Sequence, residues 1–277
     1  MASDTKATMT NLETIALGIV QGLTEFLPVS SSGHLVIFEH FLGFREPELL
    51  LDASLHLGTL IAVCAFFRDD LKRILQEIGS LVNSGQYRSF QDSPHAFLAL
   101  MVIVGSVPTA LMGIMFKDFF EGLFASVTLS GVMLLVTGGI AGLTRLIPRS
   151  HETLERVTPI MALAVGTAQG LAIMPGISRS GTTIVCALLL GLNRDMAGRF
   201  SFILSIPAII GAVILQLNAE ALGRVGILPM GLGLVSSALV GLLALRILMG
   251  MVRRGHFYYF APYCWALGLT VILFSRG

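Results

Sequence analysis

The chain has 277 residues, of which 54% are hydrophobic and 13% are charged, and its mean hydropathy is +0.82. A soluble core of this length cannot bury so much apolar side chain, so the composition excludes a soluble globular enzyme. The net charge of +1 gives no reason to expect nucleic-acid binding, and the three cysteines lie singly, without the spacing of a disulfide framework or a zinc site. We therefore expect an all-α integral membrane protein, because helices satisfy their own backbone groups in lipid.

The first residues, 1–14, are polar and lack the basic and apolar regions of a cleaved signal peptide, so we expect them to be retained. Two apolar stretches, about 11–43 and 157–192, are each interrupted in the middle by Pro, Gly and clustered hydroxyl residues. Three segments after each stretch have the length and apolarity of membrane spans: roughly 52–67, 96–116, 126–147, 199–217, 227–250 and 257–274.

The sequence also repeats itself. When the chain is shifted by 148 residues, eight positions in an 18-residue window of the first interrupted stretch match identical residues in the second. The pairs are Ala16 and Ala164, Gly18 and Gly166, Gln21 and Gln169, Gly22 and Gly170, Leu23 and Leu171, Ser30 and Ser178, Ser32 and Ser180, and Gly33 and Gly181. We therefore predict two copies of one unit, residues 1–150 and 151–277.

This order predicts a geometry. If each interrupted stretch is a re-entrant helix–loop–helix hairpin, it returns to the side that it entered, and three spans then carry the chain to the opposite side. The second hairpin enters from that side, so the two tips meet near the middle. The result is an inverted-topology repeat of six transmembrane helices and two re-entrant hairpins. The alternative is two further spans with kinks.

Loop charge predicts the orientation. On the hairpin topology, twelve Lys or Arg residues lie on one face and five on the other: Lys6, Arg45, Lys117, Arg224 and Arg276. Because positive loops stay in the cytoplasm, we expect both termini and the entry of the first hairpin to face outward.

Arg179 lies in MPGISRSGTT, at the expected tip of the second hairpin. A cation at membrane depth costs at least about 2.5–3.5 kcal/mol, so it requires a partner or an anionic ligand. Its planar fork suits a phosphate, and the amides of the following helix favour an anion as well. Four neighbouring hydroxyls are candidate substrate-binding groups: Ser178, Ser180, Thr182 and Thr183. The alternatives are an ion pair with Glu25 and ordinary helix capping.

The first hairpin contains QGLTEFLPVSSSGH, residues 21–34. Gln21 and Glu25 are four residues apart, so one helix face presents both oxygens. Together with water and a substrate phosphate, they suit a hard divalent cation. Structural hydrogen bonding is an equal alternative.

Three serines and a histidine follow in the same hairpin. A serine near an imidazole is typical of nucleophilic or general acid/base chemistry, which makes Ser31 and His34 catalytic candidates together with Glu25 and Arg179. Ser30 and Ser32 are candidate substrate-binding residues. The alternative for the histidine is a structural hydrogen bond. Polar residues at membrane depth indicate a pocket, where irregular backbone is tolerated.

Other polar residues are less informative. His56 is expected to make a packed polar contact, with a place at the border of the pocket as the alternative, and an amphipathic helix is predicted to begin near Asp69. Four aromatic residues near the last span are interpreted as interface anchors: Tyr258, Tyr259, Tyr263 and Trp265.

Two of these motifs, QGLTEFLPVSSSGH and PGISRSGTT, resemble the signature regions of the bacitracin-resistance family of undecaprenyl-diphosphate phosphatases, and HLGTLIAV at 56–63 adds to the likeness. The resemblance covers essentially the whole chain. It implies an enzyme of the bacterial inner membrane that converts undecaprenyl diphosphate to undecaprenyl phosphate, recycles the lipid carrier for cell-wall synthesis and requires Mg²⁺ or Ca²⁺. It also implies an active site that opens to the outer face and a substrate for which bacitracin competes. A homodimer is an alternative to a single chain.

By the same resemblance, Glu25 and Gln21 hold the metal, Ser31 and His34 are the nucleophile and acid/base, and Ser178, Arg179 and Thr183 bind the diphosphate. Because position 21 is Gln and not Glu, a catalytic mechanism that needs two carboxylates here would lack one of them. The attacking group is left open between Ser31, His34 and an activated water. A transporter or flippase for a polyprenyl phosphate is the rival function, because inverted repeats serve alternating access, although transport does not need the catalytic set.

Overall fold

The computed structural model describes residues 10–41, 49–83, 92–124, 126–147, 154–216 and 226–275. Within these ranges the chain is helical and forms no strand, apart from an isolated bridge between Leu154 and Leu192. The elements of the first half are α1 Asn11–Phe26, α2 Ser31–Phe41, α3 Leu49–Phe66, α4 Arg68–Asn83, α5 Pro94–Met115, α6 Lys117–Phe124, α7 Val127–Leu143 and η2 Thr144–Leu146. Those of the second half are α8 Pro159–Leu171, α9 Arg179–Leu189, α10 Arg194–Gln216, α11 Ile227–Arg254, η4 Phe257–Phe260 and α12 Ala261–Phe274.

The protein is an all-helical, multi-pass membrane protein, as its composition predicts. Five described stretches are long and apolar enough to cross a bilayer: Pro94–Met115, Val127–Leu146, Arg194–Leu215, Ile227–Arg254 and Phe257–Phe274. Each matches a predicted span. Only 28–44% of each span is buried inside the protein, so most of its apolar surface is left for lipid.

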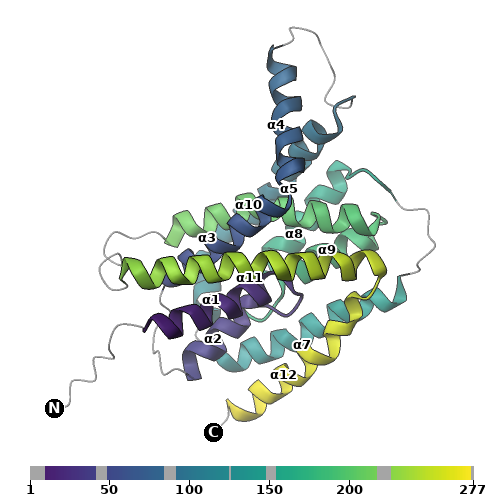
Figure 1. Ribbon diagram of the computed structural model, residues 1–277. Coiled ribbons are helices and arrows are strands. Elements are labelled where there is room, and N and C mark those ends of the chain that lie inside the picture. Colours follow the sequence, from purple (N-terminus) through teal and green to yellow (C-terminus); the bar gives the residue numbers. More distant parts are fainter. Residues whose placement is uncertain are drawn as a thin grey trace, which may run out of the picture.

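The sixth predicted span, 52–67, differs from the others. It corresponds to α3, which is long and apolar enough to cross a bilayer only when α4 is counted with it. The two helices meet at a 72° bend. Figure 1 shows α4 projecting away from the other helices. The bend begins where the chain becomes amphipathic, with Asp69 and Asp70 in the first turn of α4. The predicted amphipathic helix is thus confirmed, whereas the short helix α6 was not anticipated.

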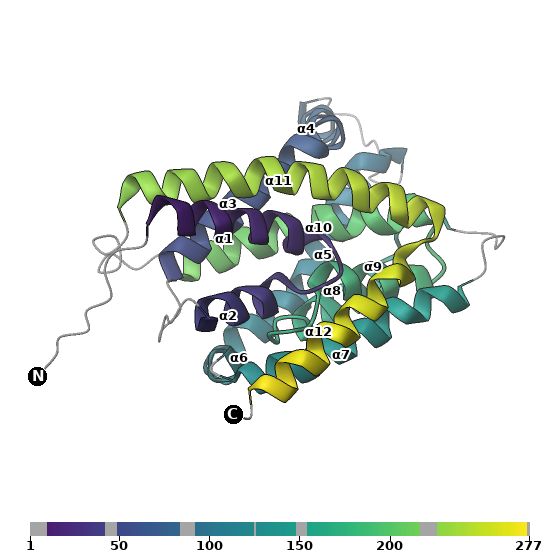
Figure 2. The same ribbon diagram turned by 60° about the horizontal axis from the view of Figure 1, so that its bottom comes forward.

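Both interrupted stretches form helix–turn–helix units at the predicted positions. Pro28 lies in the turn after α1, and Figure 2 shows α2 running back alongside α1. The longer turn between α8 and α9 contains Gly176 with φ of 92°, a left-handed conformation that glycine adopts without steric cost.

Glycines bring each unit close to the other half of the chain. In α1, a Cβ atom on Gly18 would lie 2.6 Å from the carbonyl oxygen of Gly233 in α11. In α8, a Cβ atom on Gly166, the counterpart of Gly18, would lie 1.9 Å from the carbonyl oxygen of Gly105 in α5. Each is the first residue of a Gly-x-x-x-Gly sequence, which lets helix backbones approach closely in membranes. The first helix of each unit therefore packs on a span from the opposite half.

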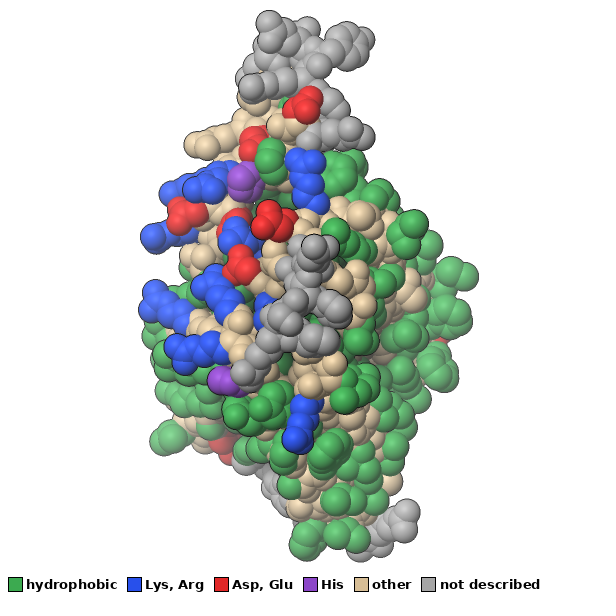
Figure 3. Space-filling model, turned by 90° about the vertical axis from the view of Figure 1, so that its right-hand side faces the viewer, with side chains coloured by type: hydrophobic (Ala, Val, Ile, Leu, Met, Phe, Trp, Pro, Cys, Tyr) green, Lys and Arg blue, Asp and Glu red, His purple; other side chains and the backbone are tan. Residues whose placement is uncertain are grey.

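Charged residues gather at one end of the molecule. Figure 3 shows Lys, Arg, Asp and Glu side chains together there, while hydrophobic side chains cover much of the remaining face. Arg199 at this end pairs with Asp70 and Asp195, and Arg253 also pairs with Asp195. The basic residues expected on the opposite face lie largely outside the described residues, namely Lys6, Arg45, Arg224 and Arg276.

Candidate functional site

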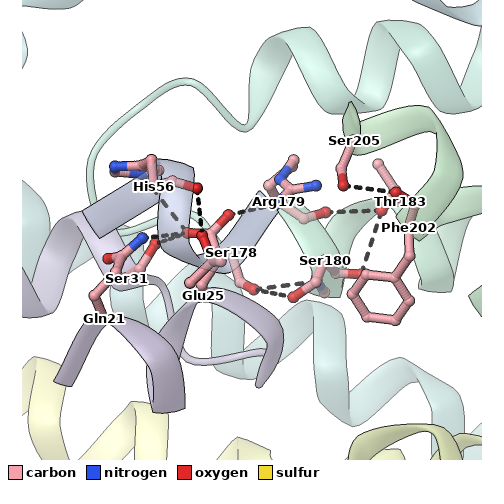
Figure 4. A network of polar contacts seen from close by, with 12 residues as sticks. Gln21, Glu25, Ser31, His56, Ser178, Arg179, Ser180, Thr183, Phe202 and Ser205 are labelled. Carbon is pink, nitrogen blue, oxygen red and sulfur yellow. Dashed lines mark hydrogen bonds and ion pairs between the residues drawn. The ribbon is translucent and has the colours of Figure 1, made fainter. Parts of the chain in front are cut away.

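The Glu25 carboxylate is the centre of a buried polar network. Glu25 lies in the last turn of α1, and its side chain is only 5% exposed. Its Oε1 accepts a hydrogen bond from Arg179, while its Oε2 accepts one from Ser31 Oγ at 2.6 Å and one from Gln21 Nε2 at 3.1 Å. Figure 4 shows these side chains converging from three helices. Three donors thus surround one carboxylate.

Arg179 links the two helix–turn–helix units. It is the first residue of α9, its side chain is 16% exposed, and its guanidinium is paired with a carboxylate 154 residues away in the sequence. The sequence predicted that the two tips meet, and the structure brings Glu25 and Arg179 into contact. The structure thus shows the ion pair that was one interpretation of Arg179.

The hydroxyls around Arg179 make local hydrogen bonds. Ser178 is the N-cap of α9 and accepts from the backbone N–H of Gly181 at 3.1 Å, and its hydroxyl lies 3.2 Å from that of Ser180. Thr182 donates to the carbonyl oxygen of Ser178, and Thr183 donates to that of Arg179. These contacts match the capping interpretation and hold the start of α9 beside Glu25.

Thr137 of α7 fixes the turn before α9, a role that the sequence analysis missed. Its Oγ1 donates to the carbonyl oxygen of Gly176 and accepts from the backbone N–H of Ser178. The side chain is buried at 1% exposure, so both polar functions of the hydroxyl are satisfied inside the protein.

His34 does not pair with Ser31 among the described contacts. Its Nδ1 lies 2.8 Å from the carbonyl oxygen of Ser30, and its Nε2 lies 2.8 Å from the hydroxyl of Tyr263 on α12. The hydroxyl of Ser30 faces that of Ser32 at 3.2 Å and caps the backbone N–H of residue 33. The spacing predicted that Ser31 and His34 act as a pair. In the structure, α2 directs the His34 imidazole toward Tyr263 on α12.

Among the described side chains, the histidine in contact with the carboxylate is His56 of α3. Its Nε2 lies 3.7 Å from Glu25 Oε2, and its Nδ1 lies 2.8 Å from the carbonyl oxygen of Asp52. From its sequence, His56 was expected to make a packed polar contact, and the alternative that it borders the pocket is the one the structure shows. The stretch that begins at this residue also belongs to the family likeness. That likeness was the signal that pointed to it.

The side chain of Gln21 shows which oxygen atoms a divalent cation could use beside Glu25. Its Oε1 is buried and has no hydrogen-bond partner among the described residues, whereas its Nε2 is bound to Glu25. An unused oxygen beside a carboxylate suits Mg²⁺, which keeps several waters and takes few protein ligands. The described residues contain no group of three or more His, Cys, Asp or Glu side chains that would form a cage from protein ligands alone. The described residues therefore offer at most the amide oxygen of Gln21 and the carboxylate of Glu25 to a cation, which would take its other ligands from elsewhere.

Comparison with known proteins gives one consistent result. The family model for "Bacitracin resistance protein BacA" matches residues 14–270. An undecaprenyl-diphosphatase of Desulfatibacillum aliphaticivorans is 46% identical over 272 residues, which cover 95% of this chain and 98% of the relative. Undecaprenyl-diphosphatases of Desulforapulum autotrophicum and Carboxydothermus hydrogenoformans are 44% and 42% identical, over 94% and 97% of this chain and 96% and 99% of the relatives. With matches that cover nearly all of its residues, this chain belongs to the BacA family of bacitracin resistance proteins.

Proposed function

We propose that this protein is a membrane phosphatase that hydrolyses undecaprenyl diphosphate to undecaprenyl phosphate and inorganic phosphate. The relatives that match nearly the whole chain are undecaprenyl-diphosphatases. The observation that carries the site is the Glu25 carboxylate, which holds the Ser31 hydroxyl at 2.6 Å and the Arg179 guanidinium at its other oxygen. A candidate nucleophile (Ser31), a proton acceptor (Glu25) and a positively charged side chain that can bind a phosphate (Arg179) therefore lie side by side.

The architecture that we propose is an inverted repeat with two re-entrant hairpins. It is supported by the exchanged glycine contacts, in which Gly18 packs on α11 and its counterpart Gly166 packs on α5. It is also supported by the course of α2 beside α1 and by the meeting of both tips at one ion pair. Such repeats place their site between the halves, at the depth where the tips meet.

Arg179 and the N-terminus of α9 would bind the diphosphate. Substrate competes with Glu25 for the guanidinium, so the ion pair opens when the phosphate arrives, and Arg179 then neutralises charge on the reacting phosphoryl group. Ser178, Ser180, Thr182 and Thr183 stand around the same helix start, and rotation of their hydroxyls offers further donors. The polyprenyl tail stays in the bilayer.

Ser31 is the nucleophile that the geometry favours. Its hydroxyl already donates to Glu25, so the carboxylate can accept the proton as the oxygen attacks the terminal phosphorus. The bond between that phosphorus and the bridging oxygen breaks, and undecaprenyl phosphate leaves. Water then hydrolyses the phosphoserine to inorganic phosphate and restores the hydroxyl. His56, 3.7 Å from the same carboxylate, is within reach of these protons.

A Mg²⁺ or Ca²⁺ ion would be held by Glu25 and Gln21. When bound, it supplies positive charge to the substrate phosphates. Gln21 contributes the buried Oε1, which makes no other hydrogen bond with the described residues. Glu25 orients Gln21 for this purpose by accepting from its Nε2.

The site would open to the outer face of the bacterial inner membrane, with both termini outward, where bacitracin competes for the same lipid. The uneven distribution of basic residues supports this orientation. A cysteine near Lys117 should react with an impermeant thiol reagent in intact cells, whereas a cysteine near Arg149 should not. The reverse labelling would contradict the orientation.

The decisive experiment measures phosphate release by purified protein from undecaprenyl diphosphate. We expect release by the natural chain and none by Arg179→Gln or Glu25→Gln. Lipid movement across vesicles without phosphate release would instead favour the transporter. Crosslinking of purified protein at low detergent tests the homodimer, and a single species of one chain would exclude it.

A further inference from the structure

Both ring nitrogens of His34 are engaged, and their partners define the tautomer. His34 is 4% exposed. The carbonyl oxygen of Ser30 can only accept, so Nδ1, 2.8 Å away, carries a proton. In a neutral imidazole Nε2 is then the acceptor, and the hydroxyl of Tyr263, 2.8 Å away, donates to it.

The other hairpin makes the same local bond without a histidine. Thr182 is the counterpart of His34 under the 148-residue shift, and its Oγ1 donates to the carbonyl oxygen of Ser178 at 2.8 Å. Ser178 is the counterpart of Ser30. A threonine is therefore sufficient for this bond, and the histidine adds only its Nε2 end, which reaches Tyr263 on α12 from 229 residues away.

Ser30 has an unusual backbone conformation, which the hydrogen bonds from His34 to its carbonyl oxygen help to fix. Its φ is 66°, and it is the one residue other than glycine with positive φ among those the structure describes, whereas Ser178 has φ of −77°. Such a conformation persists only when the surrounding contacts fix it. His34 donates to the Ser30 carbonyl oxygen from Nδ1 and also from its backbone N–H at 3.2 Å. The next residue is Ser31, so the conformation of Ser30 decides where the Ser31 hydroxyl points.

We propose that Tyr263 is a positioning residue for hydrolysis. Through its hydrogen bond to His34, it holds Ser30 in the left-handed conformation and thereby keeps the Ser31 hydroxyl on Glu25. Its kinetic consequence rests on the proposed function, whereas the hydrogen bond itself does not. His34 acts in this chain of contacts as a link between α12 and the turn, and not as the group that accepts the proton of Ser31.

Two substitutions separate this role from direct catalysis by the imidazole. Tyr263→Phe removes only the hydroxyl, and His34→Thr keeps the bond to Ser30 but loses the link to α12. We expect each to lower kcat for phosphate release by about 10- to 100-fold with KM changed by less than about twofold, and the double variant to match the single ones. Tyr258→Phe is the control, because that ring lies over Arg145, and it should leave kcat unchanged.

Two kinetic results would overturn the proposal. One is a loss in His34→Thr much larger than in Tyr263→Phe, which would make the imidazole itself catalytic. The other is losses that multiply in the double variant, because independent residues behave in this way.

Nitrogen-15 NMR of histidine-labelled protein tests the hydrogen bond without any turnover. The His34 signals are identified by their loss in His34→Thr. We expect a protonated Nδ1 and an unprotonated Nε2, and the Nε2 signal should shift in Tyr263→Phe while Nδ1 stays protonated. An unprotonated Nδ1, which could not donate to the Ser30 carbonyl oxygen, or signals unchanged by Tyr263→Phe, would refute the link. If the natural chain released no phosphate, the proposed function would fail, and this measurement would still decide the hydrogen bond.

Discussion

Replacing Glu25 with glutamine tests the network at its centre. Glu25→Gln keeps the shape of the side chain but removes the charge that Arg179 and Ser31 share. Hydrogen bonds to a charged group contribute about 1.5–3 kcal/mol each, so two such bonds amount to about 3–6 kcal/mol. Breaking a buried ion pair by removing one partner costs about 3–5 kcal/mol, because the remaining charge is left unpaired. Since the Arg179 side chain is 16% exposed and keeps some contact with water, we expect Glu25→Gln to lower the free energy of unfolding by about 3 kcal/mol.

The free energy of unfolding can be followed in detergent by the fluorescence of Trp265, the single tryptophan of the chain. Glu13→Gln is the matched control on the same helix, since Glu13 belongs to an exposed capping box in which glutamine also serves. It should change stability by less than about 0.5 kcal/mol.

A double variant identifies the cause of the loss. If an unpaired guanidinium destabilises Glu25→Gln, then adding Arg179→Gln should recover part of the stability. A Glu25→Gln protein within about 1 kcal/mol of the natural chain would refute the reasoning that this pair holds the two tips together. So would a double variant whose loss equals the sum of the two single losses.

Three further substitutions test packing, capping and cation binding. Gly166→Ala places a methyl group 1.9 Å from the Gly105 carbonyl oxygen, so it should cost about 1–3 kcal/mol in the same unfolding assay, while Gly139→Ala, with open space around it, should not destabilise. Burial raises the pKa of Glu77, but hydrogen bonds from the N-terminus of α5 and from a neighbouring histidine outweigh this effect and lower it. A lowered pKa means that the stabilisation by Glu77 is complete above the ordinary value of 4.5 and is lost as the pH falls below it. Glu77→Gln should therefore make the loss of stability in acid less steep, because the contribution of this carboxylate is removed. Gln21→Leu should raise the Mg²⁺ concentration for half-maximal phosphate release by about tenfold or more, and an unchanged requirement would remove Gln21 from the cation site.

Much of the site could be predicted from the sequence. Pro28 lacks a backbone N–H group, and Pro175 and Gly176 interrupt the second stretch, so both helix breaks were visible in the sequence. The repeated residues indicated that the two breaks form one site, and a cation at membrane depth required either an anionic ligand or a partner such as Glu25. The structure shows the pair with Glu25. The helical membrane class followed from composition and from the continuous apolar segments of about 20 residues, which satisfy their backbone groups in lipid as helices.

The partners of the histidines were decided by the tertiary structure. Sequence spacing put His34 beside Ser31, but the direction of an imidazole depends on which helix packs against it, and α12 presents Tyr263 there. His56 lies against Glu25 because α1 and α3 both pack on α11, a contact that no local pattern encodes. The sequence by itself therefore determined where the helices break and which chemical groups lie at the breaks, since these depend on local backbone sterics and on the cost of burying charge. Only the packing of helices distant in the chain decided which of those groups meet.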